Sequence, residues 1–128
     1  AATSRGVATV LRRYKPSVRI VVVEPAESAV LGGGQAGPHG IEGVGIGYIP
    51  PLWEPSLVDE VLPVGTDEAK DMTRRIARKE ALFAGTSSGA NVVAAIRVAK
   101  RLGPDARVVT LMADSGLKYL STDVYRRT

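Results

Sequence analysis

The chain has 128 residues, enough for one domain with a hydrophobic core, and its 45% of hydrophobic and 23% of charged residues argue against a disordered chain. It has no cysteine and one histidine, His39, which excludes disulfides, thiolate metal sites and a histidine cluster around a metal. The net charge of +4 is spread along the chain and no apolar segment is long enough to span a membrane, so we expect a cytoplasmic protein that binds neither nucleic acid nor membranes.

A helix is expected over residues 4–14. Its apolar positions recur at the spacing of one helical face: Val7, Val10, Leu11 and Tyr14. Pro16 ends this helix, because proline disfavours helical geometry at the preceding residue. Residues 18–23 follow as an almost unbroken β-branched run, which predicts a strand covered on both faces, as in a parallel sheet.

The segment from residue 24 to residue 51 is rich in glycine. Its eight glycines are Gly32, Gly33, Gly34, Gly37, Gly40, Gly43, Gly45 and Gly47. Long ordered loops tend to carry functional residues, and the second half of this segment is too apolar for a linker. A flexible surface excursion is the alternative that the residues alone leave open.

A second strand is expected over residues 60–64, followed by a helix over residues 67–79. Thr66 is predicted to be the N-cap of this helix, and Asp67 and Glu68 favour its positive N-terminal end. The side chains expected to face the sheet are Ala69, Met72, Ile76 and the stem of Arg75.

Residues 85–89, Gly-Thr-Ser-Ser-Gly, are expected to form a loop before a helix over residues 90–102. A third strand is expected over residues 108–112. This alternation of strands and helices predicts an α/β fold with a mainly parallel sheet, in a single domain spanning residues 1–128.

The loop at residues 85–89 is the most informative segment for function. Its hydroxyls and free backbone N–H groups crowd the N-terminus of the next helix, where an acceptor atom or an anion binds readily. Simple N-capping by Ser87 or Ser88 is the alternative, and the residues alone do not decide between the two roles.

Four segments of the chain carry distinctive motifs. They are Val-Glu-Pro within residues 23–28, Gly-Pro-His-Gly-Ile-Glu-Gly-Val-Gly within 37–50, Gly-Thr-Ser-Ser-Gly-Ala within 83–91, and Asp-Ser-Gly-x-x-Tyr-Leu-Ser at 114–121. In order and spacing they resemble the motifs of the cysteine synthase and cystathionine β-synthase family. The resemblance covers nearly the whole chain and implies the large C-terminal domain of a fold-type II pyridoxal-phosphate enzyme.

The resemblance implies an enzyme that makes cysteine from an activated serine and sulfide by β-elimination and β-replacement, with pyridoxal 5'-phosphate as cofactor. In that family the first serine of the Ser-Ser pair hydrogen-bonds the pyridine nitrogen of the cofactor, which corresponds to Ser87. A neutral hydroxyl does not force protonation of that nitrogen, which suits β-replacement better than transamination. The cofactor-binding residues implied are Thr3, Gly43, Gly45, Thr86, Ser87, Asp114 and Ser115. A structural role in a turn is the alternative for Asp114 and Ser115.

Parts of the family's site are missing. Its aldimine lysine stands in a Ser-x-Lys-x-Arg context that no lysine here shares, so no catalytic residue is assigned; the lysines are Lys15, Lys70, Lys79, Lys100 and Lys118. The asparagine loop that holds the substrate carboxylate is absent. Only the tail of the phosphate loop is present, with Ala1 and Ala2 in place of glycines and Thr3 on its last threonine.

We therefore expect the chain to be the C-terminal part of a longer, homodimeric enzyme, and to be inactive by itself. A missing N-terminal half would supply the lysine, and the small-molecule partners would be an amino-acid substrate and sulfide, with no metal. The alternatives are a non-catalytic remnant that acts as a binding module, a serine or threonine dehydratase, a cystathionine β-synthase and an O-phosphoserine sulfhydrylase.

Overall fold

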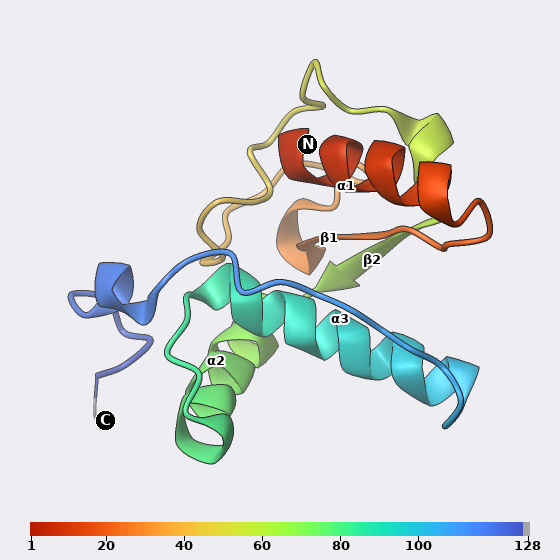
Figure 1. Ribbon diagram of the computed structural model, residues 1–128. Coiled ribbons are helices and arrows are strands. Elements are labelled where there is room, and N and C mark those ends of the chain that lie inside the picture. The colour runs from red at the N-terminus through yellow and green to blue at the C-terminus, as the bar shows by residue number, and fades with distance from the viewer. Residues whose placement is uncertain (127–128) are drawn as a thin grey trace.

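A computed structural model describes residues 1–126 of the chain (Figure 1). Its regular elements are the helix α1 (Ala2–Tyr14), the strand β1 (Val21–Pro25), the strand β2 (Glu60–Val64), the helix α2 (Thr66–Glu80) and the helix α3 (Thr86–Leu102). Three single-turn 3-10 helices accompany them: η1 (Ala26–Ser28), η2 (Pro55–Leu57) and η3 (Gly116–Tyr119). Among residues 1–126, no helix is long and apolar enough to cross a membrane.

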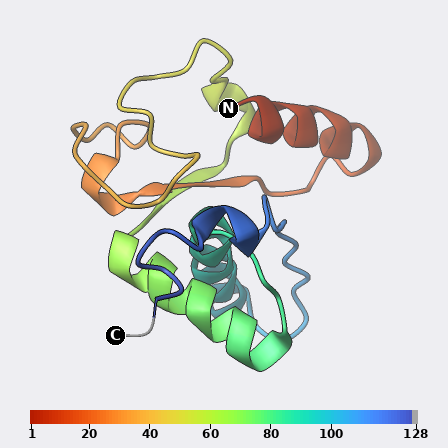
Figure 2. The same cartoon turned by 90° about the vertical axis from the view of Figure 1, so that its left-hand side faces the viewer.

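The sheet consists of β1 and β2, which are parallel, with Val23 opposite Leu62. Figures 1 and 2 show α1 on one side of this sheet and α2 and α3 on the other. The prediction of an α/β fold with parallel strands is therefore confirmed. The central core is buried between the sheet and the helices α2 and α3. Its side chains are those of Ile41, Leu62, Val64, Ala69, Ala90, Val93 and Ala94.

The helices α2 and α3 pack closely because Gly89 lies where they cross. A Cβ atom at Gly89 would collide with the hydroxyl of Thr73 and the carbonyl oxygen of Ala69, both on α2. Thr73 is fully buried, and its hydroxyl donates to the Ala69 carbonyl at 2.7 Å. The missing side chain therefore lets α3 approach the backbone of α2 and fixes where α3 begins.

The expected third strand over residues 108–112 is wrong. This segment returns along α3 in an extended path without forming a ladder (Figure 1), and Val109 is 91% exposed. A strand needs a neighbour for its backbone N–H and C=O groups, and within residues 1–126 none lies beside it. The segment is hydrogen-bonded to α3 instead: the Asn91 side-chain amide donates to the Leu111 carbonyl at 3.2 Å.

Thr66 does not cap α2, contrary to expectation. Gly65 is the N-cap, and its N–H donates to the Glu68 carboxylate at 2.8 Å. The hydroxyl of Thr66 instead accepts the N–H of Gly40 at 3.0 Å. Thr66 thereby anchors the glycine-rich segment to α2.

The predicted buried face of α2 is partly wrong, and the apolar face of α1 is not covered. On α2, Ala69 and Ile76 are buried as expected, whereas Arg75 is exposed and Thr73 takes the buried place beside them. On α1, only Ala8 is buried. The apolar stripe of this helix is exposed, from 39% at Val7 to 85% at Tyr14. Helical spacing predicts which side chains share a face, and it does not say whether another element covers that face.

Candidate functional site

The predicted site residues other than Thr3 gather towards one edge of the sheet. β1 and β2 end there, α3 begins there, and the glycine-rich segment and the C-terminal segment lie beside them, towards the left of Figure 1. In open parallel sheets, ligands bind outside the carboxyl ends of the strands. The fold therefore brings these residues to the edge where a ligand is favoured.

The predicted loop at residues 85–89 is mostly helix. Thr86, Ser87, Ser88 and Gly89 form the first turn of α3, and Gly85 is the N-cap, with extended backbone and no side chain to offer. N-capping by Ser87 or Ser88, the alternative role, is therefore wrong. The first backbone N–H groups of α3 remain without helical partners, as at any helix N-terminus.

The two serines of this first turn differ in their contacts. Ser88 is fully buried, and its hydroxyl accepts the N–H of Ala113 at 3.0 Å. Ser87 is 8% exposed, and its hydroxyl forms no hydrogen bond with residues 1–126. Ser88 therefore ties α3 to the C-terminal segment, whereas the hydroxyl of Ser87 is available to a ligand.

Two buried polar atoms near the start of α3 have no partner within residues 1–126. They are the hydroxyl oxygen of Thr86, whose residue is 1% exposed, and the Oδ1 atom of Asp114. A buried polar group left without a hydrogen bond costs about 1–3 kcal/mol. Such groups occur at sites that are completed by a ligand or by water.

Asp114 lies against the N-cap of α3. A Cβ atom at Gly85 would collide with its Oδ1 atom and with the ring of Tyr119. The other carboxylate oxygen, Oδ2, accepts the phenol of Tyr119 at 2.6 Å. Burial, followed by this bond to Asp114, raises the pKa of Tyr119 above its ordinary value of 10.0. Tyr119 therefore keeps its phenolic proton and donates a hydrogen bond to Asp114 throughout the neutral pH range.

Ser115 is placed beside Ala84, with which it forms an isolated antiparallel bridge. Its side chain is exposed, and its hydroxyl accepts the N–H of Leu117 at 3.3 Å, which caps η3. The turn role is thus observed for Ser115. Contact with a cofactor stays a prediction for both Asp114 and Ser115.

The glycine-rich segment is fastened to the end of β1. Glu24 is buried there, and its carboxylate accepts the N–H groups of Leu31 at 2.8 Å and Gly32 at 2.9 Å. Further along, Gly43 and Gly45 have positive φ angles of 86° and 60°, which favour glycine. The segment is an ordered structure with specific contacts and not a flexible excursion.

Gly45 lies between the end of β1 and an imidazole that the sequence did not single out for this site. A Cβ atom there would lie 2.8 Å from Cδ of Pro25 and 2.7 Å from Nε2 of His39. By itself, a lone histidine such as His39 indicates no metal site. Its place within the Gly-Pro-His motif is the sequence signal that could have drawn attention to it.

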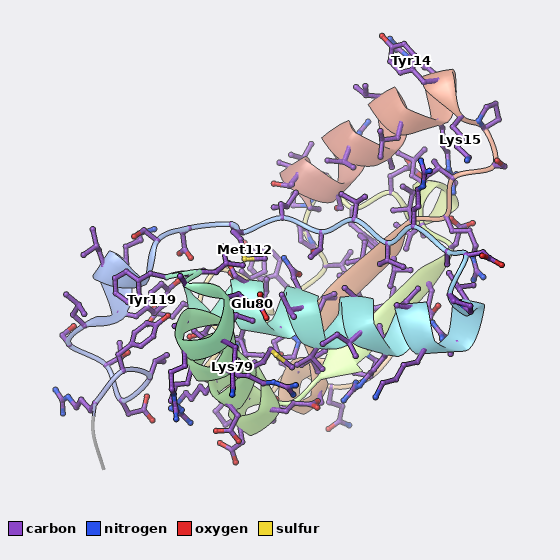
Figure 3. The ribbon with its side chains drawn as sticks, turned by 60° about the horizontal axis from the view of Figure 1, so that its bottom comes forward. Tyr14, Lys15, Lys79, Glu80, Met112 and Tyr119 are labelled. Atoms are coloured by element: carbon purple, nitrogen blue, oxygen red, sulfur yellow. The ribbon has the colours of Figure 1, made fainter. Side chains whose placement is uncertain are left out.

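Thr3 and the lysines stand apart from the start of α3. Thr3 is exposed on the first turn of α1, and its side chain is hydrogen-bonded to none of the other predicted site residues. None of the five lysines is buried. Lys118 lies beside Asp114, with Nζ 3.7 Å from Oδ2, but its side chain is 70% exposed. Lys15 and Lys79 are exposed, and Figure 3 shows Lys15 far from Tyr119.

The sequence of this chain is similar to known enzymes along most of its length. The model of the family described as "Pyridoxal-phosphate dependent enzyme" matches residues 1–114. The chain is 45% identical to a cysteine synthase of Staphylococcus aureus over 123 residues, which are 96% of this chain and 40% of the relative. It is 43% identical to a probable cysteine synthase of Bacillus subtilis with the same coverage. The chain therefore spans well under half the length of these curated relatives.

The structure is equally similar to solved enzymes. An O-acetylserine sulfhydrylase of Entamoeba histolytica matches 98% of this chain with a TM-score of 0.91 and 38% identity, over 38% of its own length. An O-acetylserine dependent cystathionine β-synthase of Helicobacter pylori matches 97% of this chain with a TM-score of 0.90 and 40% identity, over 40% of its own length. This chain belongs to the family of pyridoxal-phosphate dependent enzymes.

Proposed function

We propose that the chain is part of a cysteine synthase-like enzyme that uses pyridoxal phosphate to make cysteine from an activated serine and sulfide. The observation that carries the proposal is the Ser87 hydroxyl in the first turn of α3, which has no hydrogen-bond partner within residues 1–126. It is supported by the similarity to cysteine synthases over 96% of the chain. The similarity supports a family that uses this cofactor, and the Ser87 hydroxyl is a side-chain group that could bind it.

The residues present fit the cofactor. Pyridoxal phosphate, when bound, withdraws electrons from an amino acid and so weakens the bonds at its α and β carbons. The Ser87 hydroxyl would hydrogen-bond the pyridine nitrogen, and the buried, unpaired hydroxyl of Thr86 supports a polar contact beside it. Because a hydroxyl is neutral, Ser87 orients the ring without placing a charge next to its nitrogen.

The other predicted residues would line the same cleft. Gly43 would let the backbone approach the cofactor and substrate, since no atom lies within 4 Å of the place of its missing side chain. Gly45 would contribute its backbone to the same wall, while the place of its missing side chain is taken by Pro25 and His39. Thr3 would contact the phosphate at the N-terminal end of α1, where backbone N–H groups favour anions. Asp114, held by Tyr119 at 2.6 Å, would border the ring, and Ser115 would shape the turn that follows.

The rest of the site would come from an N-terminal part of the protein. The curated relatives are more than twice as long as their match to this chain, which covers 40% of them. We infer that this part supplies the lysine that holds the cofactor and the group that binds the substrate carboxylate. We expect residues 1–128 alone to be inactive, and the whole enzyme to be a cytoplasmic homodimer.

A cystathionine β-synthase is the second candidate. The similarity to an O-acetylserine dependent cystathionine β-synthase, with a TM-score of 0.90, favours it specifically. Both reactions would share the activated serine and differ in the thiol that attacks it. The residues described above would hold the cofactor in the same way in either enzyme.

The test uses the full-length protein that carries this chain, purified with pyridoxal phosphate. We expect an absorbance band of bound cofactor that changes when O-acetylserine is added, and cysteine as the product with sulfide. Preferential reaction with a larger thiol would replace the first candidate by the second. If the full-length protein binds no cofactor and forms neither product, the chain is a non-catalytic binding module and the proposal is wrong. Residues 1–128 alone serve as the control and should form no product.

A further inference from the structure

The imidazole of His39 bridges two parts of the glycine-rich segment. The N–H of Ile41 lies 3.2 Å from Nδ1, and a backbone N–H can only donate, so Nδ1 is the acceptor. The proton of the neutral ring is therefore on Nε2. This Nε2–H donates to the carbonyl oxygen of Gly45 at 2.8 Å.

One side of this bridge is firmly anchored. Ile41 is fully buried in the core cluster beneath the sheet. Its neighbour Gly40 donates its N–H to the hydroxyl of Thr66 at 3.0 Å. The backbone next to His39 is therefore fixed by the packing of Ile41 in the core and by the hydrogen bond from Gly40 to α2.

The other side is held by His39. Residues 42–49 are mostly exposed, with Ile46 at 52% and Tyr48 at 60%. Within residues 1–126, the bond from His39 to Gly45 is the hydrogen bond that ties this stretch to the rest of the chain. Gly45 is pressed between this imidazole and Pro25, which ends β1. Val44 also packs against the core cluster, so apolar contacts set the position of this part of the stretch, and the bond from His39 sets the direction of the Gly45 carbonyl.

We propose that His39 is a positioning residue. It holds the Gly45 carbonyl and thereby fixes the backbone of residues 43–45, which would form one wall of the site for the amino-acid substrate. This inference rests on the proposed function, because it assigns the wall to a substrate cleft. His39 acts through the loop and does not touch the substrate. A wall that is equally placed before and during the reaction affects substrate binding, so its loss raises KM more than it lowers kcat.

Three substitutions in the full-length protein separate the two nitrogens. In His39→Gln the side-chain amide places an N–H close to the position of Nε2 and can still reach Gly45. In His39→Asn the carbonyl oxygen lies close to the position of Nδ1 and can serve only Ile41. His39→Ala removes both bonds. Arg101→Gln is the matched control, because it breaks one exposed ion pair with Glu60, at 2.8 Å, away from this loop.

We expect His39→Ala and His39→Asn to raise KM for O-acetylserine about tenfold, the effect of one lost hydrogen bond, with kcat within about twofold. His39→Gln should stay within about threefold of the unchanged protein in KM, and Arg101→Gln should match it. A merely structural role would affect Gln and Asn alike. If His39→Gln is as impaired as His39→Ala, or if His39→Asn restores KM equally well, the inference is wrong.

Limited proteolysis with a protease of broad specificity gives a second readout that does not depend on activity. Cleavage within residues 42–49 should be faster in His39→Ala and His39→Asn than in His39→Gln and the control, because the loop is held less firmly when the bond to the Gly45 carbonyl is lost. If the unchanged protein makes no cysteine, the proposed function fails, while the cleavage rates still test the bond from His39 to Gly45. If the protein is active and cleavage within this stretch is equally fast in all variants, the positioning role of His39 fails alone.

Discussion

The phenol of Tyr119 donates a hydrogen bond to Oδ2 of Asp114 at 2.6 Å, and both side chains lie where a side chain on Gly85 would be. One pair thus joins the C-terminal segment to the residue that begins α3. The same carboxylate keeps its Oδ1 atom buried and unpaired. Asp114 and Tyr119, in the C-terminal segment, therefore pack against the residue at which α3 and the candidate cofactor site begin.

Replacing Tyr119 by Phe should destabilise the protein by about 1–3 kcal/mol at neutral pH, because the bond to a charged acceptor is lost. Burial and Asp114 raise the pKa of Tyr119 above 10.0, whereas in the unfolded chain it ionises near that value. The unfolded state therefore releases this proton first, and the stability it contributes is present below pH 10.0 and lost as pH rises above it. Denaturant unfolding at neutral and alkaline pH measures both effects.

The difference between the unchanged protein and Tyr119→Phe should shrink in the alkaline range. Tyr14→Phe is the control, since Tyr14 is 85% exposed and points outward in Figure 3. It should leave the unfolding free energy unchanged at every pH. A constant difference between Tyr119→Phe and the unchanged protein from neutral to alkaline pH would contradict the prediction.

Substituting alanine at two helical glycines should have opposite effects. Gly89→Ala should destabilise the protein by about 1–3 kcal/mol, because the new methyl group meets the Ala69 carbonyl and Thr73 hydroxyl and forces α2 and α3 apart. Gly6→Ala meets nothing within 4 Å and should stabilise α1 by about 0.5–1 kcal/mol. Thermal or denaturant unfolding of the two variants checks this. A tolerated Gly89→Ala would mean that the helices do not cross as described.

The two serines of α3 should separate cofactor binding from stability. Ser87→Ala removes a hydroxyl with no partner in the described chain, so we expect unchanged stability and about tenfold weaker binding of pyridoxal phosphate. Ser88→Ala removes the acceptor of the Ala113 N–H and should cost about 1–2 kcal/mol of stability. Cofactor titration and unfolding of the cofactor-free full-length protein provide the measurements. Equal cofactor affinity in Ser87→Ala and the unchanged protein would remove Ser87 from the site.

Thr86→Val tests the buried hydroxyl that has no partner within residues 1–126. Valine has nearly the same shape, so the cofactor-free protein should be as stable as before or gain about 1 kcal/mol. If Thr86 contacts the cofactor, the same change should weaken cofactor binding. Equilibrium unfolding without cofactor and cofactor titration measure the two effects separately. A loss of stability in the cofactor-free protein would show that the hydroxyl has a partner when the protein is free.

The sequence predicted the helical positions and the two strands well. Periodic apolar positions and β-branched runs are local signals, and α1, β1, β2 and α2 lie within a few residues of their expected ranges. Ser87 was singled out in another way, by the resemblance of the four motifs to a known family, and its contact with the cofactor stays a prediction. The role of a residue at a helix start is less local, and Gly85 rather than a serine proved to be the N-cap of α3.

The sequence by itself determined the α/β character, the family motifs and the segment that carries Ser87, because each depends on neighbours close in the chain. Only the tertiary structure showed that residues 108–112 have no strand to pair with among residues 1–126, since a ladder needs a second segment whose presence no local pattern reports. It also decided that Asp114 meets Gly85 and that His39 holds Gly45. Those contacts depend on how distant segments pack and on which donor faces which acceptor, and the spacing of residues along the chain does not encode them.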